Sequence, residues 1–414
     1  MSRTGPTTQN WGGTRPGSMP PDARTLIEEG VVIPPTRILE RGQARWERVR
    51  ELLTGSAFPS RAVDDNLADV RAQLAANHHG GELLRGLAAT HGASTVEHYM
   101  GALTLRSEQR IREALRRRKA GEYRAAERLD EGSPLEVQIT LDGTGGARFD
   151  FSGSAATHPG NLNATPAIVR SAVLYVLRLL IDERLPLNEG LLRPVEIHLP
   201  PGLLNPDFSE DPARAPAVVG GNTEVSQRLV DTLLKALGLG ACSQGTMNNV
   251  LWGNERFTYY ETVCGGAGAG PGYPGRSAVH THMTNTRITD AEVLEQRYPV
   301  RVERFSIRSG SGGGGRWCGG DGAIRELTFL EPMTLSVLTQ HRREQPYGVD
   351  GGGPGVVGLQ SVIRASGAIE PLGPVDGCDV EAGDRLVLET PGGGGWGAAD
   401  SHRTGSLASE ENLR

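Results

Sequence analysis

Apolar residues in the first third of the chain recur at the spacing of helices rather than strands. Two apolar stripes lie between residues 64 and 119, and Gly80 and Gly81 interrupt the first. Apolar positions three and four residues apart share one face of a helix, so this segment is predicted to be helical. Residues 1–60 are expected to be irregular because prolines block helix propagation. The first stripe comprises Leu67, Val70, Leu74, Leu83, Leu84 and Leu87, and the second Val96, Met100, Leu103, Ile111 and Leu115.

The middle of the chain mixes helical and strand-like patterns. Residues 135–141 alternate strictly between apolar and polar side chains, which predicts a half-buried strand. An apolar run over 166–182 starts with a proline, which suits the first position of a buried helix. A further helix is predicted over 223–237, and the strand-like runs 246–252 and 256–262 predict a hairpin.

The last quarter of the chain, from Val300 onward, shows only strand and turn signals. The predicted fold class is therefore α+β, with mixed sheets, glycine-rich loops, a helical N-terminal segment and a β-rich C-terminal subdomain. Three sequential parts are expected, followed by a polar tail over 398–414 that is expected to be disordered. The parts are 1–134, irregular and helical, 135–299, an α/β core that carries the candidate site, and 300–397, which is β-rich.

The chain holds 57 glycines, and many gather in clusters. Glycine has no side chain to pack, so such clusters predict tight turns or main chain brought close to a ligand or to another segment. We expect the cluster 264–275 to face substrate, with Gly266 and Gly268 among the substrate-binding residues. The clusters 309–322 and 391–397 are expected to serve turns or chain packing.

Composition narrows the class of protein. The 414 residues carry a formal net charge of −6, which argues against a nucleic-acid surface. The most apolar run, 167–181, is too short and too charged to span a membrane, and the first 21 residues lack the apolar core of a signal peptide. Four cysteines without C-x-x-C spacing favour a reduced, cytoplasmic protein.

The familiar nucleotide motifs are absent. The run Gly265–Gly270 lacks the Lys-Ser/Thr ending of a phosphate-binding loop and the G-x-G-x-x-G spacing of a dinucleotide site. No G-x-S-x-G or H-E-x-x-H motif occurs either. The sequence therefore gives no sign of an ATP site in this chain.

Several short polar segments carry the candidate chemistry. His280 and His282 are two apart and would point the same way on a strand, so with Glu261 they form either a metal or acid–base site or a set of structural side chains. Asn163 is either a turn residue or a substrate ligand, and Asn222 either caps a helix or binds an anion. We expect the two histidines and Glu261 to meet at a cleft beside residues 264–275. The candidate catalytic residues are Glu261, His280, His282, Asn285 and Arg287, and the candidate substrate-binding residues are Asn163, Asn222, Gly266 and Gly268.

In their order along the chain, these segments resemble the hydantoinase B/oxoprolinase family, and most closely its 5-oxoprolinase branch. The likeness extends over nearly all of Gly12–Gly397. It rests on Phe149–Ser152 (FDFS), Gly160–Ala164 (GNLNA), Val218–Glu224 (VVGGNTE), Tyr259–Gly270 (YYETVCGGAGAG), Ala278–Asp290 (AVHTHMTNTRITD) and Thr390–Gly397 (TPGGGGWG).

The resemblance implies an enzyme that opens a cyclic amide at the expense of ATP. In the 5-oxoprolinase branch the reaction converts 5-oxo-L-proline to L-glutamate. An A-type partner domain or subunit binds the ATP and phosphorylates the lactam oxygen, and the B-type region, which this chain resembles, completes the ring opening. The implied partners are thus an A-type polypeptide and a small cyclic amide, and an oligomer is expected.

The chain departs from the family pattern at its start. Family members usually carry an upstream His-x-x-Asp pair and then a His-His-Ala-Asp-Ile-Gly-Gly run, where this chain has Thr7–Gly13. Because those residues resemble metal ligands in carboxylase relatives, a divalent metal stays undecided. Two alternatives remain: the B subunit of an ATP-dependent hydantoinase, and a structural subunit without catalytic activity.

Overall fold

A computed structural model of the chain describes residues 11–284 and 286–399. The chain forms two compact units, and each is built from segments that alternate along the sequence. The first unit runs through Ala126 and includes Leu135–Asn222 and Leu251–Tyr260. The second comprises Glu127–Pro134, Thr223–Val250 and the chain from Glu261 onward. The sequential parts expected with boundaries at 134 and 299 differ from this division, because packing joins segments that are distant in sequence.

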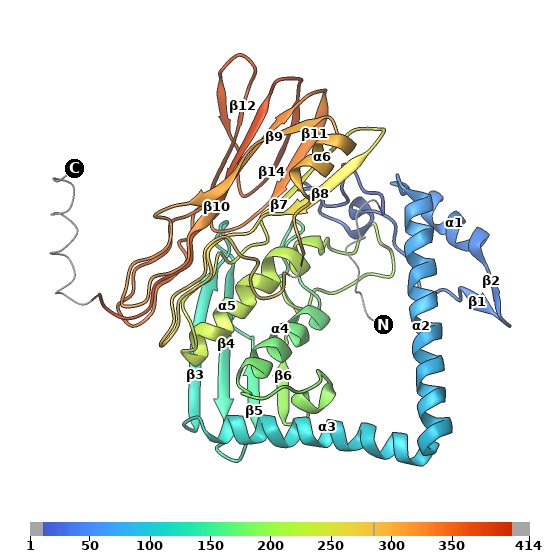
Figure 1. The fold of residues 1–414 in the computed structure, drawn as a ribbon, viewed down its shortest axis with the longest axis vertical. Coiled ribbons are helices and arrows are strands. Elements are labelled where there is room, and N and C mark those ends of the chain that lie inside the picture. The colour runs from blue at the N-terminus through green and yellow to red at the C-terminus, as the bar shows by residue number, and fades with distance from the viewer. Residues whose placement is uncertain (1–10, 285, 400–414) are drawn as a thin grey trace. The chain divides into compact units, whose positions relative to one another are not determined.

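The first unit begins with short elements and two long helices (Figure 1). Helix α2 buries Leu67 and Val70 near its start, and α3 buries Ile111 and Leu115 near its end. The stretch between these two ends leaves large apolar side chains exposed. The elements are η1 (Leu26–Glu29), β1 (Leu39–Glu40), β2 (Gln43–Ala44), α1 (Trp46–Thr54), α2 (Val63–His91) and α3 (Ala93–Arg116).

A four-stranded sheet with the order β3-β4-β5-β6 follows in the chain. Its strands are β3 (Gly121–Arg128), β4 (Pro134–Leu141), β5 (Ala147–Asp150) and β6 (Val195–His198). Strand β4 buries its alternate apolar residues, which confirms the predicted half-buried strand. Strands β4 and β5 are antiparallel, whereas β5 and β6 are parallel. The connection from β5 to β6 contains the predicted buried helix α4 (Pro166–Leu179) and η2 (Glu189–Leu192).

The second unit contains one central helix and most of the strands. A π-helical turn, η3 (Gly221–Val225), leads into helix α5 (Ser226–Leu237). Strands β7 (Asn249–Gly253) and β8 (Thr258–Thr262) carry the chain out of this unit and back. An antiparallel sheet has the order β13-β12-β15-β10-β9, and β11 pairs with β14. The remaining elements are α6 (Ala291–Arg297), β9 (Val300–Arg308), β10 (Gly322–Phe329), β11 (Met333–Leu338), β12 (Leu359–Ile363), β13 (Ile369–Pro371), β14 (Val375–Val380) and β15 (Arg385–Glu389).

The glycine clusters of the second unit pack against one another, and we call them the glycine bundle (residues 264–275, 309–322, 348–358 and 391–397). Main-chain hydrogen bonds join neighbouring segments: Ala269 N donates to Gly394 O at 2.9 Å, and Gly393 N to Gly320 O at 2.8 Å. A Cβ on Gly393 would lie 2.0 Å from the carbonyl oxygen of Ala267. Glycine is therefore required here because the main chains approach too closely for any side chain.

All the glycine clusters take part in close main-chain packing. Gly266 N donates to Pro391 O at 3.0 Å, and a Cβ on Gly266 would lie 2.0 Å from Gly320 O. A Cβ on Gly268 would lie 2.0 Å from the carbonyl oxygen of Ala241, which lies outside the bundle. Close packing thus accounts for the lack of a side chain at both glycines, and their role in binding substrate stays a prediction.

The α+β class is confirmed, with its helical N-terminal segment and a C-terminal part that from β9 onward contains only strands and turns in the described residues. Across the described helices, none has both the length and the apolar character needed to cross a bilayer. Residues 400–414 of the predicted tail lie outside the described residues.

Candidate functional site

Helix α5 is buried except at Lys235, although it carries several polar and charged residues. Gln227 and Asp231 are fully buried and Arg228 is 1 % exposed. A buried charge is costly unless it is paired and hydrogen-bonded. The partners of these side chains therefore show which loops the helix positions.

Asp231 forms a buried pair with His282. The carboxylate accepts hydrogen bonds from Ser243 N and Ser243 Oγ, both at 3.0 Å, and lies 3.1 Å from His282 Nε2. Burial raises the pKa of Asp231, but His282 and the Ser243 hydrogen bonds outweigh this and leave it lowered. An ionised carboxylate only accepts hydrogen bonds, so Nε2 of His282 is the donor. The His282 side chain is 14 % exposed, so part of its ring is accessible to solvent, whereas the Asp231 side chain is fully buried.

The main chain around His282 is held in an unusual conformation. Its φ of 50° lies in the left-handed region, which histidine adopts more readily than most residues. Gln227 fixes the loop on both sides: its Nε2 donates to Thr281 O at 3.0 Å, and its Oε1 accepts from Met283 N at 3.3 Å. Local strain of this kind persists only where the surrounding structure enforces it, and it is common at functional sites.

The expected same-side arrangement of His280 and His282 on a strand is wrong. The segment is a loop, and the left-handed conformation at His282 breaks the alternation of an extended chain. His280 is half-buried, and its Nδ1 has no hydrogen-bond partner in the described part of the chain. Burial lowers the pKa of His280, which favours the neutral ring.

Glu261 has a different charged partner. Its two carboxylate oxygens accept hydrogen bonds from Nε and Nη2 of Arg325, both at 3.1 Å, and both side chains are 2 % exposed. The Arg325 guanidinium also lies over the ring of Phe305, 5.2 Å from its centroid. This bidentate pair joins β8 to β10 and favours the structural alternative for Glu261 over the general-base one.

Glu224, in the π-helical turn before α5, is a buried carboxyl group that the sequence reasoning did not single out. Its Oε1 accepts from Met247 N at 3.1 Å and from Asn249 Nδ2 at 2.7 Å. Its Oε2 is buried and finds no hydrogen-bond partner among the described residues. Burial raises the pKa of Glu224 to about 7, since hydrogen bonds and the charge of Arg342 offset only part of the desolvation. A carboxyl group with such a pKa can exchange protons near neutrality.

A second set of buried side chains contacts α5 but contains no reactive nucleophile. Arg228 Nη1 lies 2.8 Å from Nδ1 of His341, and Nε2 of the same ring lies 3.5 Å from Cys242 Sγ. Burial and Arg228 lower the pKa of His341, whereas burial raises that of Cys242. The pair is therefore a neutral imidazole and a thiol, which suits packing better than catalysis.

Asn163 and Asn222 belong to the first unit. The Asn163 side chain is fully buried and connects loops: Oδ1 accepts from His158 N at 2.7 Å, and Nδ2 donates to Ala217 O at 2.9 Å. This favours the turn reading of Asn163. Asn222 is exposed within the π-helical turn, directly after Gly221, whose missing side chain lets it approach Asn163 O. The motif Gly160–Ala164 thus meets the Val218–Asn222 part of the motif Val218–Glu224 in this unit.

Arg287 and Asn285 are the two remaining candidate catalytic residues. Arg287 is exposed, and Asn285 lies outside the described residues. Within residues 11–284 and 286–399, no three His, Cys, Asp or Glu side chains are grouped as a metal site requires. The described residues by themselves therefore do not form such a site, and the divalent metal considered from the sequence stays a prediction.

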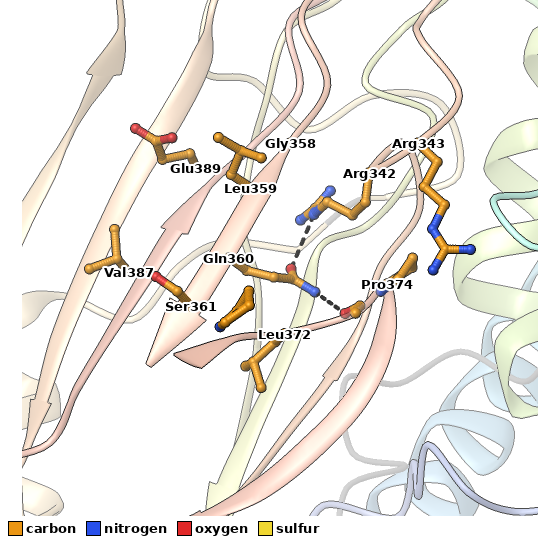
Figure 2. A pocket seen from close by; sticks show the side chains of 12 residues that line it. Arg342, Arg343, Gly358, Leu359, Gln360, Ser361, Leu372, Pro374, Val387 and Glu389 are labelled. Atoms are coloured by element: carbon orange, nitrogen blue, oxygen red, sulfur yellow. Dashed lines mark hydrogen bonds between the residues drawn. The ribbon is translucent and has the colours of Figure 1, made fainter. Parts of the chain in front are cut away.

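A cavity of about 560 Å³ lies elsewhere in the second unit, beside β12 and β15 (Figure 2). Its main buried polar groups are already paired: Arg342 Nε donates to Gln360 Oε1 at 3.1 Å, and Gln360 Nε2 donates to Gly373 O at 2.5 Å. Because these polar groups are already hydrogen-bonded within the protein, the Asp231–His282 pair is the better candidate for chemistry.

The sequence did contain a signal for Asp231 and Glu224. Glu224, Gln227 and Asp231 are spaced three and four residues apart, so they form a polar stripe along a helix whose other residues are mostly apolar. A stripe of this kind is usually solvated, and only the fold shows that it is buried.

Comparison with known proteins identifies the family of the chain. Residues 8–399 match the profile of the hydantoinase B/oxoprolinase family. The chain belongs to this family.

The chain is 41% identical over 399 residues to the 5-oxoprolinase of Dictyostelium discoideum, covering 94% of this chain and 31% of that protein. It is also 41% identical over 410 residues to 5-oxoprolinase 1 of Arabidopsis thaliana, covering 94% and 32%. The chain thus spans about a third of the length of these relatives. Its fold is similar to that of the ATP-dependent caprolactamase of Pseudomonas jessenii, with a TM-score of 0.81, 26% identity, and coverage of 94% of this chain and 70% of that chain.

Proposed function

We propose that this chain is the B-type region of a 5-oxoprolinase and completes the ATP-dependent opening of 5-oxo-L-proline to L-glutamate. The A-type partner, a domain or a separate subunit, binds the ATP. The observation that carries the proposal is the 41% identity to 5-oxoprolinases over 94% of this chain. A reaction shared between two regions agrees with the absence of a phosphate-binding motif from this sequence.

The chemistry explains why two regions cooperate. An amide carbon is a poor electrophile, and transfer of the ATP γ-phosphoryl group to the lactam oxygen activates it. Water then adds to the activated carbon and gives up a proton. The ring C–N bond breaks as the nitrogen takes up a proton, and the phosphate is released by hydrolysis. The B-type region must therefore move protons to and from a site that excludes bulk water.

The Asp231–His282 pair is suited to that task. Asp231 holds Nε2 of the ring, fixes its tautomer and stabilises the imidazolium that forms when His282 accepts a proton. Proton exchange with substrate would then pass through Nδ1. The left-handed main chain at His282 holds the ring in place, together with the two hydrogen bonds that join Gln227 to Thr281 O and Met283 N on either side of it.

The test combines the purified chain with an A-type polypeptide and measures release of L-glutamate and ADP. We expect ATP-dependent glutamate release from the mixture and no ATP turnover by this chain alone. Replacing His282 by Gln should lower turnover by about 100-fold or more, because proton transfer by a positioned side chain contributes about that much. His78→Gln is the matched control, since His78 is exposed on α2.

Other outcomes separate the alternatives. Turnover of a hydantoin, without glutamate release from 5-oxo-L-proline, would make the chain a hydantoinase subunit. A stable complex that turns over neither cyclic amide would overturn the catalytic proposal in favour of a structural subunit. Full activity of the His282→Gln complex would remove His282 from the mechanism while leaving the reaction assigned.

A further inference from the structure

Two fully buried side chains of the second unit, Glu224 and Gln244, are held by neighbouring residues of one segment. Glu224 Oε1 accepts from Asn249 Nδ2 at 2.7 Å, and Gln244 Oε1 accepts from Asn248 Nδ2 at 2.8 Å. The other polar atom of each group, Oε2 of Glu224 and Nε2 of Gln244, is buried and has no partner among the described residues. One carboxylate acceptor and one amide donor are thus left without a hydrogen bond beside the same segment.

The orientation of the Gln244 amide follows from its neighbours. Arg342 Nη2 donates to one side-chain atom of Asn248 at 2.9 Å, and because arginine has donors only, that atom is the oxygen. The nitrogen of Asn248 therefore donates to Val263 O at 3.0 Å and to Gln244. A flipped Gln244 amide would place two NH₂ groups face to face. Its Nε2 is hence fixed as the atom without a partner.

Gln244 lies beside the segments that carry the Asp231–His282 pair. A Cβ on Gly265 would lie 2.0 Å from Gln244 Oε1, so glycine at this position makes room for the Gln244 side chain. Gly265 in turn exchanges main-chain hydrogen bonds with Val279, three residues before His282. The residue directly before Gln244 donates to Asp231. The two unpartnered atoms thus belong to the surroundings of the candidate site.

The chemistry of the two atoms indicates what binds them. A buried polar group without a partner costs free energy, and water or a functional ligand is the usual reason that such a group is kept. Water accepts one hydrogen bond and donates another, as an amide donor and a carboxylate acceptor require. It is also small enough to reach side chains that are 0% exposed. A larger ligand would need a cavity, and neither Glu224 nor Gln244 lines the cavity beside β12 and β15.

We propose that Glu224 and Gln244 hold the water molecule that opens the ring, with Gln244 Nε2 donating to its oxygen and Glu224 Oε2 acting as the base. This assignment rests on the proposed function. The water oxygen bonds to the activated carbon as one of its protons passes to Glu224. When the ring C–N bond breaks, its electron pair stays on the nitrogen, which takes a proton from Nδ1 of the His282 imidazolium. The second water proton passes to solvent as the new carbonyl forms, and the proton on Glu224 returns through solvent to His282.

A single-turnover experiment on the complex of this chain with an A-type polypeptide, ATP and 5-oxo-L-proline separates the two halves of the reaction. ADP reports phosphorylation of the lactam, and glutamate reports the addition of water. Glu224→Gln keeps the shape of the side chain but removes the base. It should leave ADP formation near the natural rate and lower glutamate release by about 100-fold or more, as for loss of a positioned base. Equal slowing of both products, or natural glutamate release, would overturn the role of Glu224.

Glu29→Gln is the matched control for this variant. Glu29 is also a buried carboxyl group whose pKa burial raises to about 7, and it accepts hydrogen bonds from Val218 N and Val219 N. This change should alter the rate of neither product. A selective loss of glutamate release in Glu29→Gln would show that any buried carboxyl group has this effect, and it would overturn the assignment of the base to Glu224.

A pair of glutamine variants tests the amide donor. Gln244→Met removes a donor that has no partner within the chain, so the melting temperature should stay near the natural value while glutamate release falls and ADP formation does not. Gln360→Met is the control, because Gln360 is hydrogen-bonded through both its oxygen and its nitrogen. It should lower the melting temperature and keep the natural ratio of glutamate to ADP. Natural glutamate release by Gln244→Met would remove Gln244 from the site.

A crystal structure of the natural chain tests the site without any activity. An ordered water should lie within about 3.2 Å of both Glu224 Oε2 and Gln244 Nε2. A direct contact between the two groups, or the lack of a shared water, would overturn the proposal. If the water is present but the natural complex releases no glutamate, the proposed reaction fails and the water site stands. The comparison with ADP formation is then made with a hydantoin as the cyclic amide.

Discussion

Helix α5 and the α2–α3 arm depart from the ordinary amphipathic helix in opposite directions. Helix α5 buries polar and charged side chains such as Asp231, whereas the arm exposes apolar ones such as Leu84. Polar groups enter an interior at a cost that only specific partners offset, and those partners are loops that α5 holds in place. Apolar groups stay in water at a cost that only another surface removes. The first departure points inward to chemistry, and the second leaves apolar surface in contact with solvent.

Removal of the Asp231 carboxylate should give the largest effect. Asp231→Ala leaves the Ser243 donors and His282 without their buried acceptor, and breaking a buried pair in this way costs about 3–5 kcal/mol. Urea denaturation followed by circular dichroism measures the loss in free energy of unfolding. Asp231→Asn keeps the shape and should lose less stability, but it should still lower turnover by the full complex. Equal stability of Asp231→Ala and the natural chain would show that the pair is not coupled to the fold.

The same residues show how far the sequence alone can reach. The alternation over 135–141 predicted both the strand β4 and its buried face, because successive side chains of a strand point to opposite faces of the sheet. The pairing of Asp231 with His282 could not be predicted, since it joins residues 51 apart through a left-handed turn that leaves no pattern. Strand alternation instead suggested the wrong relation between His280 and His282.

The glycine bundle and Glu261 also have partners that could not be predicted from the sequence. Glycine clusters were visible in the sequence, but a residue without a side chain does not reveal which main chain lies against it. The pairing of segments such as 264–275 with 391–397 is a property of the fold. The polar neighbourhood of Glu261 likewise suggested chemistry, whereas its buried partner Arg325 lies 64 residues away. Helices and strands were thus predictable, and long-range partners were not.

Matched leucine truncations compare the two helices directly. Leu229→Ala in α5 removes a side chain that is 1% exposed, which typically costs 2–5 kcal/mol, so about 3 kcal/mol is expected. Leu84→Ala on the arm removes one that is 50% exposed, and it should cost the chain less than about 0.5 kcal/mol. Denaturation in urea followed by circular dichroism provides both values. A large loss for Leu84→Ala would mean that this side chain is covered in solution.

The pH dependence of stability tests Glu224. Because its folded pKa is raised to about 7, its contribution is fully present below the unfolded pKa of about 4.5 and is lost as pH rises through 7. The shift corresponds to about 3 kcal/mol, at 1.36 kcal/mol per pKa unit. Glu224→Gln should remove this part of the decline between pH 4.5 and 8, as followed by urea denaturation. Glu29, whose pKa burial also raises to about 7, gives a parallel variant, Glu29→Gln, that should remove a separate part. A Glu224→Gln curve parallel to that of the natural chain would show that Glu224 ionises normally.

The smallest effects should come from glycine-to-alanine substitutions in α2. Gly80→Ala and Gly86→Ala each add a methyl group to α2, at positions where no atom of the described chain lies within 4 Å. Both should stabilise the chain by roughly 0.5–1 kcal/mol, because alanine loses less backbone entropy in a helix than glycine does. Thermal unfolding followed by circular dichroism measures both shifts, with the natural chain as the reference. A loss of stability in either variant would show that another segment packs against that glycine in solution.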